Sequence, residues 1–258
     1  MNTETNSWVE VRGVRIGEGI PKICVPIVGT TRDEILAAAK SFESVKKDVV
    51  EWRADWFNGV FDFAQVEAVM TELRQVLGNT PVLFTFRTAN EGGEKAIEPA
   101  AYAELNKRAA ATRLIDLVDV EAFTGDEVVR DIIESAHESG VVVVASNHDF
   151  EKTPEKDEIV RRLRKMQELD ADIPKIAVMP QSRKDVLTLL SATEEMASEY
   201  ADRPIITMSM SATGLISRLC GECFGSALTF GAVGKASAPG QMNASDLSEI
   251  LNLIHTSL

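Results

Sequence analysis

The sequence has 258 residues, of which 45% are hydrophobic and 26% charged, a composition typical of a globular protein and unlike a disordered chain. The net charge of −13 argues against a general affinity for nucleic acid or for an anionic membrane surface. An anionic small molecule stays possible as a ligand, because a local basic pocket can oppose the overall field.

No apolar run reaches the length of a membrane span, and the opening segment MNTETNSWVEVRGV lacks the apolar stretch of a signal peptide. Three cysteines, an odd number, argue against a disulfide framework and indicate the reducing cytoplasm. Cys220 and Cys223 form one CxxC, which could be half a zinc site or a redox pair. Without a second CxxC or a nearby histidine, we interpret them as two thiols in a helix-to-strand connection.

Along the chain, apolar runs alternate with segments whose apolar residues recur at three- and four-residue spacing, as in helices. Such helical segments include RDEILAAAKSFESVKK and TPEKDEIVRRLRKMQELD, and the last is DLSEILNLIHTSL. Glycine and proline between the segments indicate turns. The predicted strands are residues 22–29, 49–55, 81–87, 114–121, 140–149, 173–179, 204–211 and 227–234.

Eight strand–helix units in this order predict an α/β fold, a single-domain (β/α)8 TIM barrel over residues 1–258. The opening segment WVEVRGVRIG alternates around Gly13, and we expect an N-terminal β-hairpin at about 8–17 that caps one end of the barrel. A doubly wound open sheet is the main alternative. It is disfavoured because no glycine-rich dinucleotide fingerprint follows the first strand.

The interior of the barrel is predicted from strand alternation, because alternate side chains face the barrel interior and the surrounding helices. We assign the more polar face of each strand to the interior. These faces carry Glu51, Arg53 and Asp55, then Thr85 and Arg87, then Ser146 and His148, and finally Lys175. Barrel enzymes have their active sites at the C-terminal ends of the strands, where Arg53, Arg87 and His148 fall. Glu51 and Lys175 lie deeper.

Each of these residues alone also has a structural interpretation. Glu51 could form a buried ion pair with Arg53, and Arg87 could hold a carboxylate at the barrel rim. Lys175 could pair with Glu51 or Asp119, and His148 could bind a backbone carbonyl. Together they indicate chemistry, because a desolvated lysine beside other cations is favoured as the free amine, a nucleophile toward carbonyls. We expect a Schiff-base lysine with a histidine acid/base, acting on an anionic oxygenated substrate.

The segments EWRAD, LFTFRTANEGGE, SNHDF, PKIAVMP and FGAVGKASAPGQM resemble the type I 3-dehydroquinate dehydratase family, in the family's order and over nearly the whole chain. The resemblance implies a (β/α)8 barrel, a homodimer, and no metal or organic cofactor. It also implies a lyase of the shikimate pathway that dehydrates 3-dehydroquinate by syn elimination. Family members often carry a serine late in the first strand, where this chain has Pro26.

The same resemblance implies roles for individual residues. Lys175 matches the imine-forming lysine, His148 the catalytic histidine and Glu91 the carboxylate that orients it. Arg218, in SRLCG, matches the arginine that binds the substrate carboxylate. The remaining matches are Glu51, Arg53 and Arg87 for the ring hydroxyls, Ser237 and Gln241 for a lid at about 234–241, and Met208, Met210 and Phe230 for the apolar lining.

Two other functions stay open from the residues. A class I aldolase-type barrel would use the same lysine to cleave a carbon–carbon bond and release two fragments. A catalytically silent barrel would bind a carboxylate metabolite without turnover.

Overall fold

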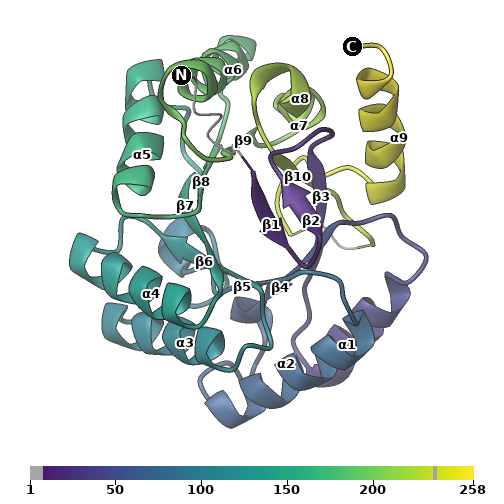
Figure 1. Cartoon of the computed structure of the whole chain (residues 1–258), viewed down its shortest axis with the longest axis vertical. Coiled ribbons are helices and arrows are strands. Elements are labelled where there is room, and N and C mark those ends of the chain that lie inside the picture. Colours follow the sequence, from purple (N-terminus) through teal and green to yellow (C-terminus); the bar gives the residue numbers. More distant parts are fainter. Residues whose placement is uncertain (1–7, 235–236) are drawn as a thin grey trace, which may run out of the picture.

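The structure, a computed structural model, describes residues 8–234 and 237–258. Within these ranges lie a two-stranded antiparallel sheet and an eight-stranded parallel sheet with the order β10-β3-β4-β5-β6-β7-β8-β9. At the seam between β9 and β10, Ile205 and Ser226 form a parallel bridge, and the amide of Thr207 donates to Ser226 Oγ at 3.0 Å. Figure 1 shows the helices around these strands. The predicted (β/α)8 barrel is confirmed.

The elements alternate along the chain. The strands are β1 Val9–Val11, β2 Val14–Ile16, β3 Lys22–Ile27, β4 Val49–Arg53, β5 Val82–Thr85, β6 Leu117–Glu121, β7 Val142–Asp149, β8 Ile173–Val178, β9 Ile206–Ser209 and β10 Leu228–Phe230. The helices are α1 Arg32–Ser41, α2 Phe63–Leu77, α3 Pro99–Ala111, α4 Asp126–Glu138, α5 Lys156–Glu168, α6 Arg183–Glu195, α7 Leu215–Leu219, α8 Gly221–Phe224 and α9 Ala244–His255. Short turns of helix are η1 Ala54–Trp56, η2 Ala89–Glu91 and η3 Met196–Tyr200.

Several helices begin at a residue whose side chain satisfies the free amides of the first turn. Thr31 accepts from the amide of Glu34, whose carboxylate returns a bond to the amide of Thr31, and Ser182 and Asp185 form the same box before α6. Such caps contribute about 1 kcal/mol each. They fix the residue at which each of these helices starts.

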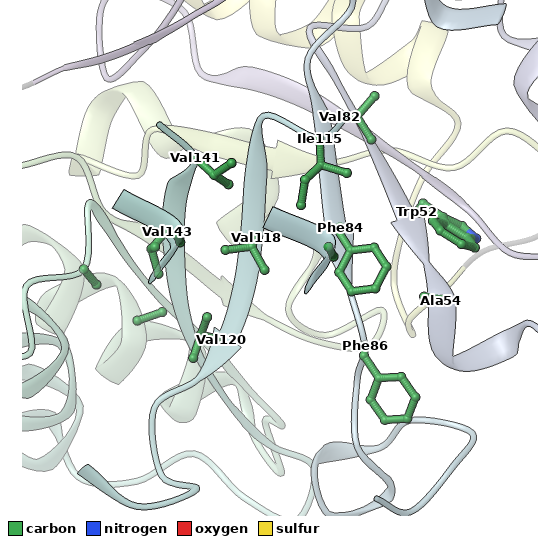
Figure 2. Packing of buried hydrophobic residues seen from close by; sticks show 14 of the residues in the cluster. Trp52, Ala54, Val82, Phe84, Phe86, Ile115, Val118, Val120, Val141 and Val143 are labelled. Carbon is green, nitrogen blue, oxygen red and sulfur yellow. The ribbon is translucent and has the colours of Figure 1, made fainter. Parts of the chain in front are cut away.

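The apolar core has two layers, as strand alternation requires. Trp52 and Phe84 face outward and pack with Leu73 of α2 in the layer between strands and helices, part of which Figure 2 shows. Leu83 and Met208 face inward and belong to a separate cluster inside the barrel. The strand phase predicted from the sequence is therefore correct.

The N-terminal hairpin closes the end of the barrel where the strands begin. Val11 and Ile16 are buried in the interior cluster, together with Val49 and Leu117. Arg12, in the tight turn with a φ of 49°, holds the hairpin in place by donating from Nε to Asp116 Oδ1 at 2.5 Å, just before β6. The predicted hairpin and its capping position are confirmed.

The predicted strands are all present but shorter than expected. The segment predicted as 81–87 ends as β5 at Thr85, and the segment 49–55 ends as β4 at Arg53 because the chain turns into η1. The predicted helix at the C-terminus ends at His255. Cys220 is buried between α7 and α8, Cys223 is exposed, and both are free thiols.

Membrane insertion has no support from the helices. Among the described residues, none of the helices combines the length and the apolar character needed to span a bilayer.

Candidate active site

One pocket at the C-terminal ends of the strands brings together every residue predicted for the site. Its walls are Glu51, Arg53, Arg87, Glu91, Gly92, His148, Phe150, Lys175, Ala177, Met208, Met210, Arg218, Phe230, Ser237, Ala238 and Gln241. The cavity offers about 40 Å³ to the centres of water molecules.

Lys175 enters this pocket from the middle of β8. It is in register with Ser146 of β7, two residues before the level of His148. Its buried ammonium donates from Nζ to Asp119 Oδ2 at 3.0 Å and lies 4.8 Å from the centre of the Phe230 ring. Of the two acids proposed as its partner from the sequence, Asp119 is the one that binds it, and Glu51 is not.

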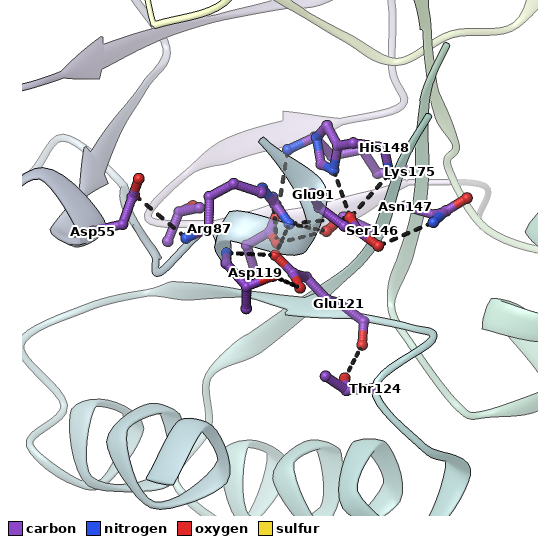
Figure 3. A network of polar contacts seen from close by, with 12 residues as sticks. Asp55, Arg87, Glu91, Asp119, Glu121, Thr124, Ser146, Asn147, His148 and Lys175 are labelled. Carbon is purple, nitrogen blue, oxygen red and sulfur yellow. Dashed lines mark hydrogen bonds and ion pairs between the residues drawn. The ribbon is translucent and has the colours of Figure 1, made fainter. Parts of the chain in front are cut away.

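Arg87 holds the acids of the pocket floor together, as Figure 3 shows. It donates from Nη2 to Asp119 Oδ1 at 2.7 Å and from Nη1 to Glu121 Oε1 at 2.9 Å, and Glu91 Oε2 lies 3.6 Å from Nη1. Burial alone would raise the pKa of Asp119, but Arg87 and Lys175 outweigh it and hold that pKa well below its usual range. Asp119 is therefore a carboxylate shared by two buried cations.

His148 is fixed by Glu91 from η2. Glu91 Oε2 lies 2.9 Å from both the backbone nitrogen and the ring Nδ1 of His148, while Oε1 accepts from Asn147 Nδ2 at 3.0 Å. An ionised carboxylate accepts only, so Nδ1 carries the proton, and Nε2, which has no hydrogen-bond partner among the described residues, is the acceptor. Phe150 stacks on the imidazole, with ring centres 6.3 Å apart.

Burial acts on both members of this pair. It raises the pKa of Glu91 to about 7, against the opposing charge of Arg87. It lowers the pKa of His148 well below its ordinary value, and the charges of Arg87 and Lys175 add to that effect. The neutral imidazole with a free Nε2 is therefore the favoured form of His148 in the empty pocket.

Glu51 and Arg53 do not form the ion pair suggested from the sequence. Arg53 makes a bidentate pair with Asp55, from Nε and Nη2 at 2.8 Å each, because the turn into η1 places Asp55 beside its guanidinium. Glu51 instead accepts from Thr85 Oγ1 at 2.9 Å. This arrangement leaves Arg53 Nη1 to donate to the carbonyl of Ser237 at 3.3 Å.

Arg218 lies buried in α7 and differs from the other arginines of the pocket. Its guanidinium donates to the carbonyl of Pro239 at 3.2 Å and approaches Met208 Sδ at 3.6 Å, and its Nε has no hydrogen-bond partner among the described residues. In the part of the chain that the structure describes, no carboxylate lies within ion-pair distance of it. Burial lowers the pKa of Arg218 to about 10. It is a desolvated cation facing a cavity.

The segment after β10 lies over the pocket. The amide of Ser237 donates to Gln241 Oε1 at 3.0 Å, and Gln241 Nε2 donates back to Ser237 Oγ at 3.0 Å. Arg53 and Arg218 bind carbonyls of this segment, so the pocket's two rim cations also hold its cover. Of the predicted lid at 234–241, residues 235–236 lie outside the described residues.

Some residues of the site were not assigned to it from the sequence. Glu121 accepts from the amide and hydroxyl of Thr88 as well as from Arg87. Alternation in LIDLVDVE places Glu121 on the same face as Asp119, a signal that could have identified it. Gly92 and Phe150 follow strand ends in irregular segments, where alternation gives no signal.

A metal site has no support from the side chains. Within residues 8–234 and 237–258, no group of three or more histidine, cysteine or acidic side chains is arranged to hold a metal ion.

A closed parallel barrel with a charged pocket at the C-terminal ends of its strands defines the class of (β/α)8-barrel enzymes. Within this class, the chain belongs to the type I 3-dehydroquinase family, whose sequence model matches residues 23–258.

Relatives resemble the chain over almost its whole length. It is 56% identical over 250 residues to a 3-dehydroquinate dehydratase of Clostridioides difficile strain 630, covering 97% of this chain and 98% of that protein. A crystal structure of the type I enzyme from Clostridium difficile with covalently modified comenic acid matches with a TM-score of 0.95 and 55% identity, over 97% and 99% of the two chains. The enzyme of Geobacillus kaustophilus matches with a TM-score of 0.94 and 38% identity, over 96% of each chain.

Proposed function

We propose that this protein dehydrates 3-dehydroquinate to 3-dehydroshikimate by syn elimination, through a Schiff base on Lys175 with His148 as general base and acid. The observation that carries the proposal is that Lys175 and His148 line one buried pocket, with Nδ1 of His148 bound to Glu91 and Nε2 left free. Membership of the type I 3-dehydroquinase family supports the reaction.

The first step is imine formation. The amine of Lys175 adds to the ketone of the substrate, water leaves, and the resulting iminium withdraws electrons from the neighbouring carbon. The amine must be unprotonated to attack, so Nζ must leave its bond with Asp119 at 3.0 Å, a carboxylate that Arg87 also binds at 2.7 Å.

Elimination follows from the iminium. Nε2 of His148 takes the proton next to the iminium carbon, and the electrons of the broken C–H bond form an enamine. The enamine then expels the hydroxyl one carbon further on, which leaves as water with the proton from His148. Because one imidazole serves both steps, both groups leave from the same face of the ring. Hydrolysis of the product imine consumes one water and frees Lys175.

Substrate recognition is divided among the remaining walls. We assign the substrate carboxylate to Arg218, because a bidentate anion would supply the negative charge that this buried guanidinium lacks among the described residues. The ring hydroxyls are assigned to Glu51, Arg53 and Arg87. The apolar lining is Met208, Met210 and Phe230, and the cover is the segment with Ser237 and Gln241.

The cover must move for the substrate to bind, because Arg218, the residue assigned to the substrate carboxylate, donates to the carbonyl of Pro239 in the cover. Opening breaks the bonds from Arg53 and Arg218 to the carbonyls of Ser237 and Pro239. An incoming carboxylate replaces the second of these bonds with a charge-assisted one.

The proposal is tested by adding 3-dehydroquinate to the purified protein and following the ultraviolet absorbance of a conjugated enone. Borohydride added during turnover should trap a covalent adduct that intact-mass analysis and peptide mapping place on Lys175. His148→Ala should still give the adduct but almost no enone, and Lys175→Met should give neither. Two carbon fragments in place of an enone would establish the aldolase alternative, and ligand-induced stabilisation without turnover would establish a silent barrel.

We also propose that the protein is a homodimer that works in the cytoplasm, as the family resemblance implies. Light scattering on the purified protein should give twice the mass of the chain. A mass equal to one chain would refute the dimer.

A further inference from the structure

Asn147 occupies an unusual position on β7. Its neighbours in the strand, Ser146 and His148, face the pocket, so Asn147 belongs to the outward face that carries Val143 and Ala145 in the apolar layer. An amide buried in such a layer is costly unless both of its ends are hydrogen-bonded. Asn147 is 8% exposed, so its partners decide whether it is tolerated.

Both ends of this amide are bonded. Nδ2 donates to Glu91 Oε1 at 3.0 Å on the pocket side, a contact drawn in Figure 3, and Oδ1 accepts from Arg162 Nη1 at 2.9 Å on the helix side. Arg162 lies on α5, outside the barrel, and its Nε also donates to Glu158 Oε1 at 2.8 Å. A continuous chain of hydrogen bonds therefore runs from the outer helix through Asn147 and Glu91 to the ring of His148.

Arg162, at the outer end of this series of hydrogen bonds, sets the orientation of the Asn147 amide. A guanidinium has donors and no acceptor, so Arg162 can face only the oxygen of the Asn147 amide. The NH2 group must then face Glu91, which accepts this bond and those from His148 as a carboxylate. If the amide turned over, its oxygen would face Glu91 Oε1, and a bond there would require protonated Glu91. Glu91 would then hold Nδ1–H of His148 less firmly.

We propose that Arg162 and Asn147 are positioning residues, which keep Glu91 ionised and His148 in the tautomer with a free Nε2. Arg162 is not among the residues that line the pocket, and its hydrogen-bonded route to Glu91 runs through the Asn147 amide. The inference rests on the proposed function, in which that nitrogen moves the proton.

Other charges also act on this pair. The groups that face Glu91 and His148 from the neighbouring strands are Arg53, Arg87, Asp119, Glu121 and Lys175. Those near Arg162 are Glu158 and Asp149, the latter at 3.7 Å. Burial already raises the pKa of Glu91 to about 7, so its ionisation near neutral pH is sensitive to the loss of one donor.

The chain offers a matched control beside Arg162. Arg161 is on the same helix, more exposed, and makes its own bidentate bonds to Glu158. Arg161→Met therefore removes one positive charge and one pair with Glu158, but leaves the bond to Asn147 in place. Arg162→Met removes that bond as well, together with the weaker pair with Asp149 at 3.7 Å. Arg162→Lys keeps a group that only donates, and should preserve the orientation of the amide.

The test compares wild type with these three variants by ¹⁵N spectroscopy of labelled histidine, which distinguishes the two neutral tautomers without substrate. The chain has three histidines, and His148→Gln assigns the signal. In wild type and Arg161→Met we expect the Nδ1–H tautomer. In Arg162→Met we expect a mixture with Nε2–H and a kcat about tenfold lower, the effect of one hydrogen bond to a charged group. We expect KM within twofold, and recovery of kcat and tautomer in Arg162→Lys.

A single Nδ1–H tautomer in Arg162→Met would overturn the inference, as would an equal loss of kcat in Arg161→Met. Melting curves show that each variant is folded at the temperature of measurement, and Arg162→Lys gives a readout should Arg162→Met fail to fold. If wild type does not dehydrate 3-dehydroquinate, the proposed function fails, while the tautomer comparison still decides whether Arg162 sets the state of His148.

Discussion

Replacing Arg218 with methionine should stabilise the empty protein while abolishing efficient substrate capture. An arginine ordinarily titrates at about 12.5, and each pKa unit corresponds to about 1.4 kcal/mol. The pKa of Arg218 is lowered to about 10 by burial, so keeping this cation charged costs the folded protein about 3 kcal/mol. Because the folded pKa lies below the unfolded one and both lie above 7, the full cost is present at neutral pH.

The lost contacts offset part of this gain. Removing the bond to Pro239 costs about 1 kcal/mol, so Arg218→Met should raise the free energy of unfolding by about 1–2 kcal/mol. For a chain of this size that corresponds to a rise in Tm of roughly 2–4 °C. The same variant should lose kcat/KM by at least about 100-fold, because in the proposed function the substrate carboxylate loses its bidentate partner.

Urea unfolding and steady-state kinetics of Arg218→Met and Arg53→Met test both parts of this prediction. Arg53 is also buried, but its charge is paired with Asp55, and its loss leaves this fully buried carboxylate without its cation. Arg53→Met should therefore destabilise the protein by about 3 kcal/mol. If both variants lose stability to the same extent, then the charge of Arg218 does not destabilise the empty protein and the reasoning is wrong. An unchanged kcat/KM in Arg218→Met would remove the carboxylate assignment.

Three further outcomes follow from the contacts described above. First, kcat/KM should fall below about pH 7. Burial raises the pKa of Glu91 to about 7, so Glu91 becomes protonated in this range and releases Nδ1–H of His148. The fall should be absent in Glu91→Gln, and a flat wild-type profile between pH 5.5 and 8 would contradict it. Second, Asp119→Asn should lower the free energy of unfolding by about 3 kcal/mol in urea, because two buried cations lose the carboxylate that they share; a change below 1 kcal/mol would contradict the shared pair. Third, Arg12→Ala should lower Tm by about 2–4 °C and leave kcat unchanged, since it frees the hairpin from Asp116 at the end of the barrel opposite the pocket. A loss of kcat would contradict the separation of the two ends.

The positions of the site residues could be predicted because two simple rules govern them. Period-two alternation assigned Glu51, Arg53 and Lys175 to the interior, and the two apolar layers confirm that assignment. Placement at strand ends follows from counting along each strand. Resemblance to the family was needed for Glu91, Arg218 and the covering segment, which lie beyond strand ends where no periodicity applies.

The sequence left alternatives for the partners of these residues, because the partners depend on the stagger of the barrel and on the path of each loop. Arg53 pairs with Asp55 and not with Glu51, because the chain leaves β4 directly after Arg53. Lys175 meets Asp119 across two strand spacings, and no local rule chooses between this acid and Glu51. That Arg218 has no acid beside it among the described residues depends on the whole pocket and not on the segment SRLCG.

The hairpin closes the N-terminal end of the barrel. Val11 and Ile16 fill this end with apolar side chains, below the layer of acids that surrounds Lys175. Substrate and product must therefore use the same entrance, beneath the segment that Arg53 and Arg218 hold. In each catalytic cycle this entrance must open once for the substrate to bind and once for the product to leave. The product of the proposed reaction should therefore inhibit competitively with the substrate.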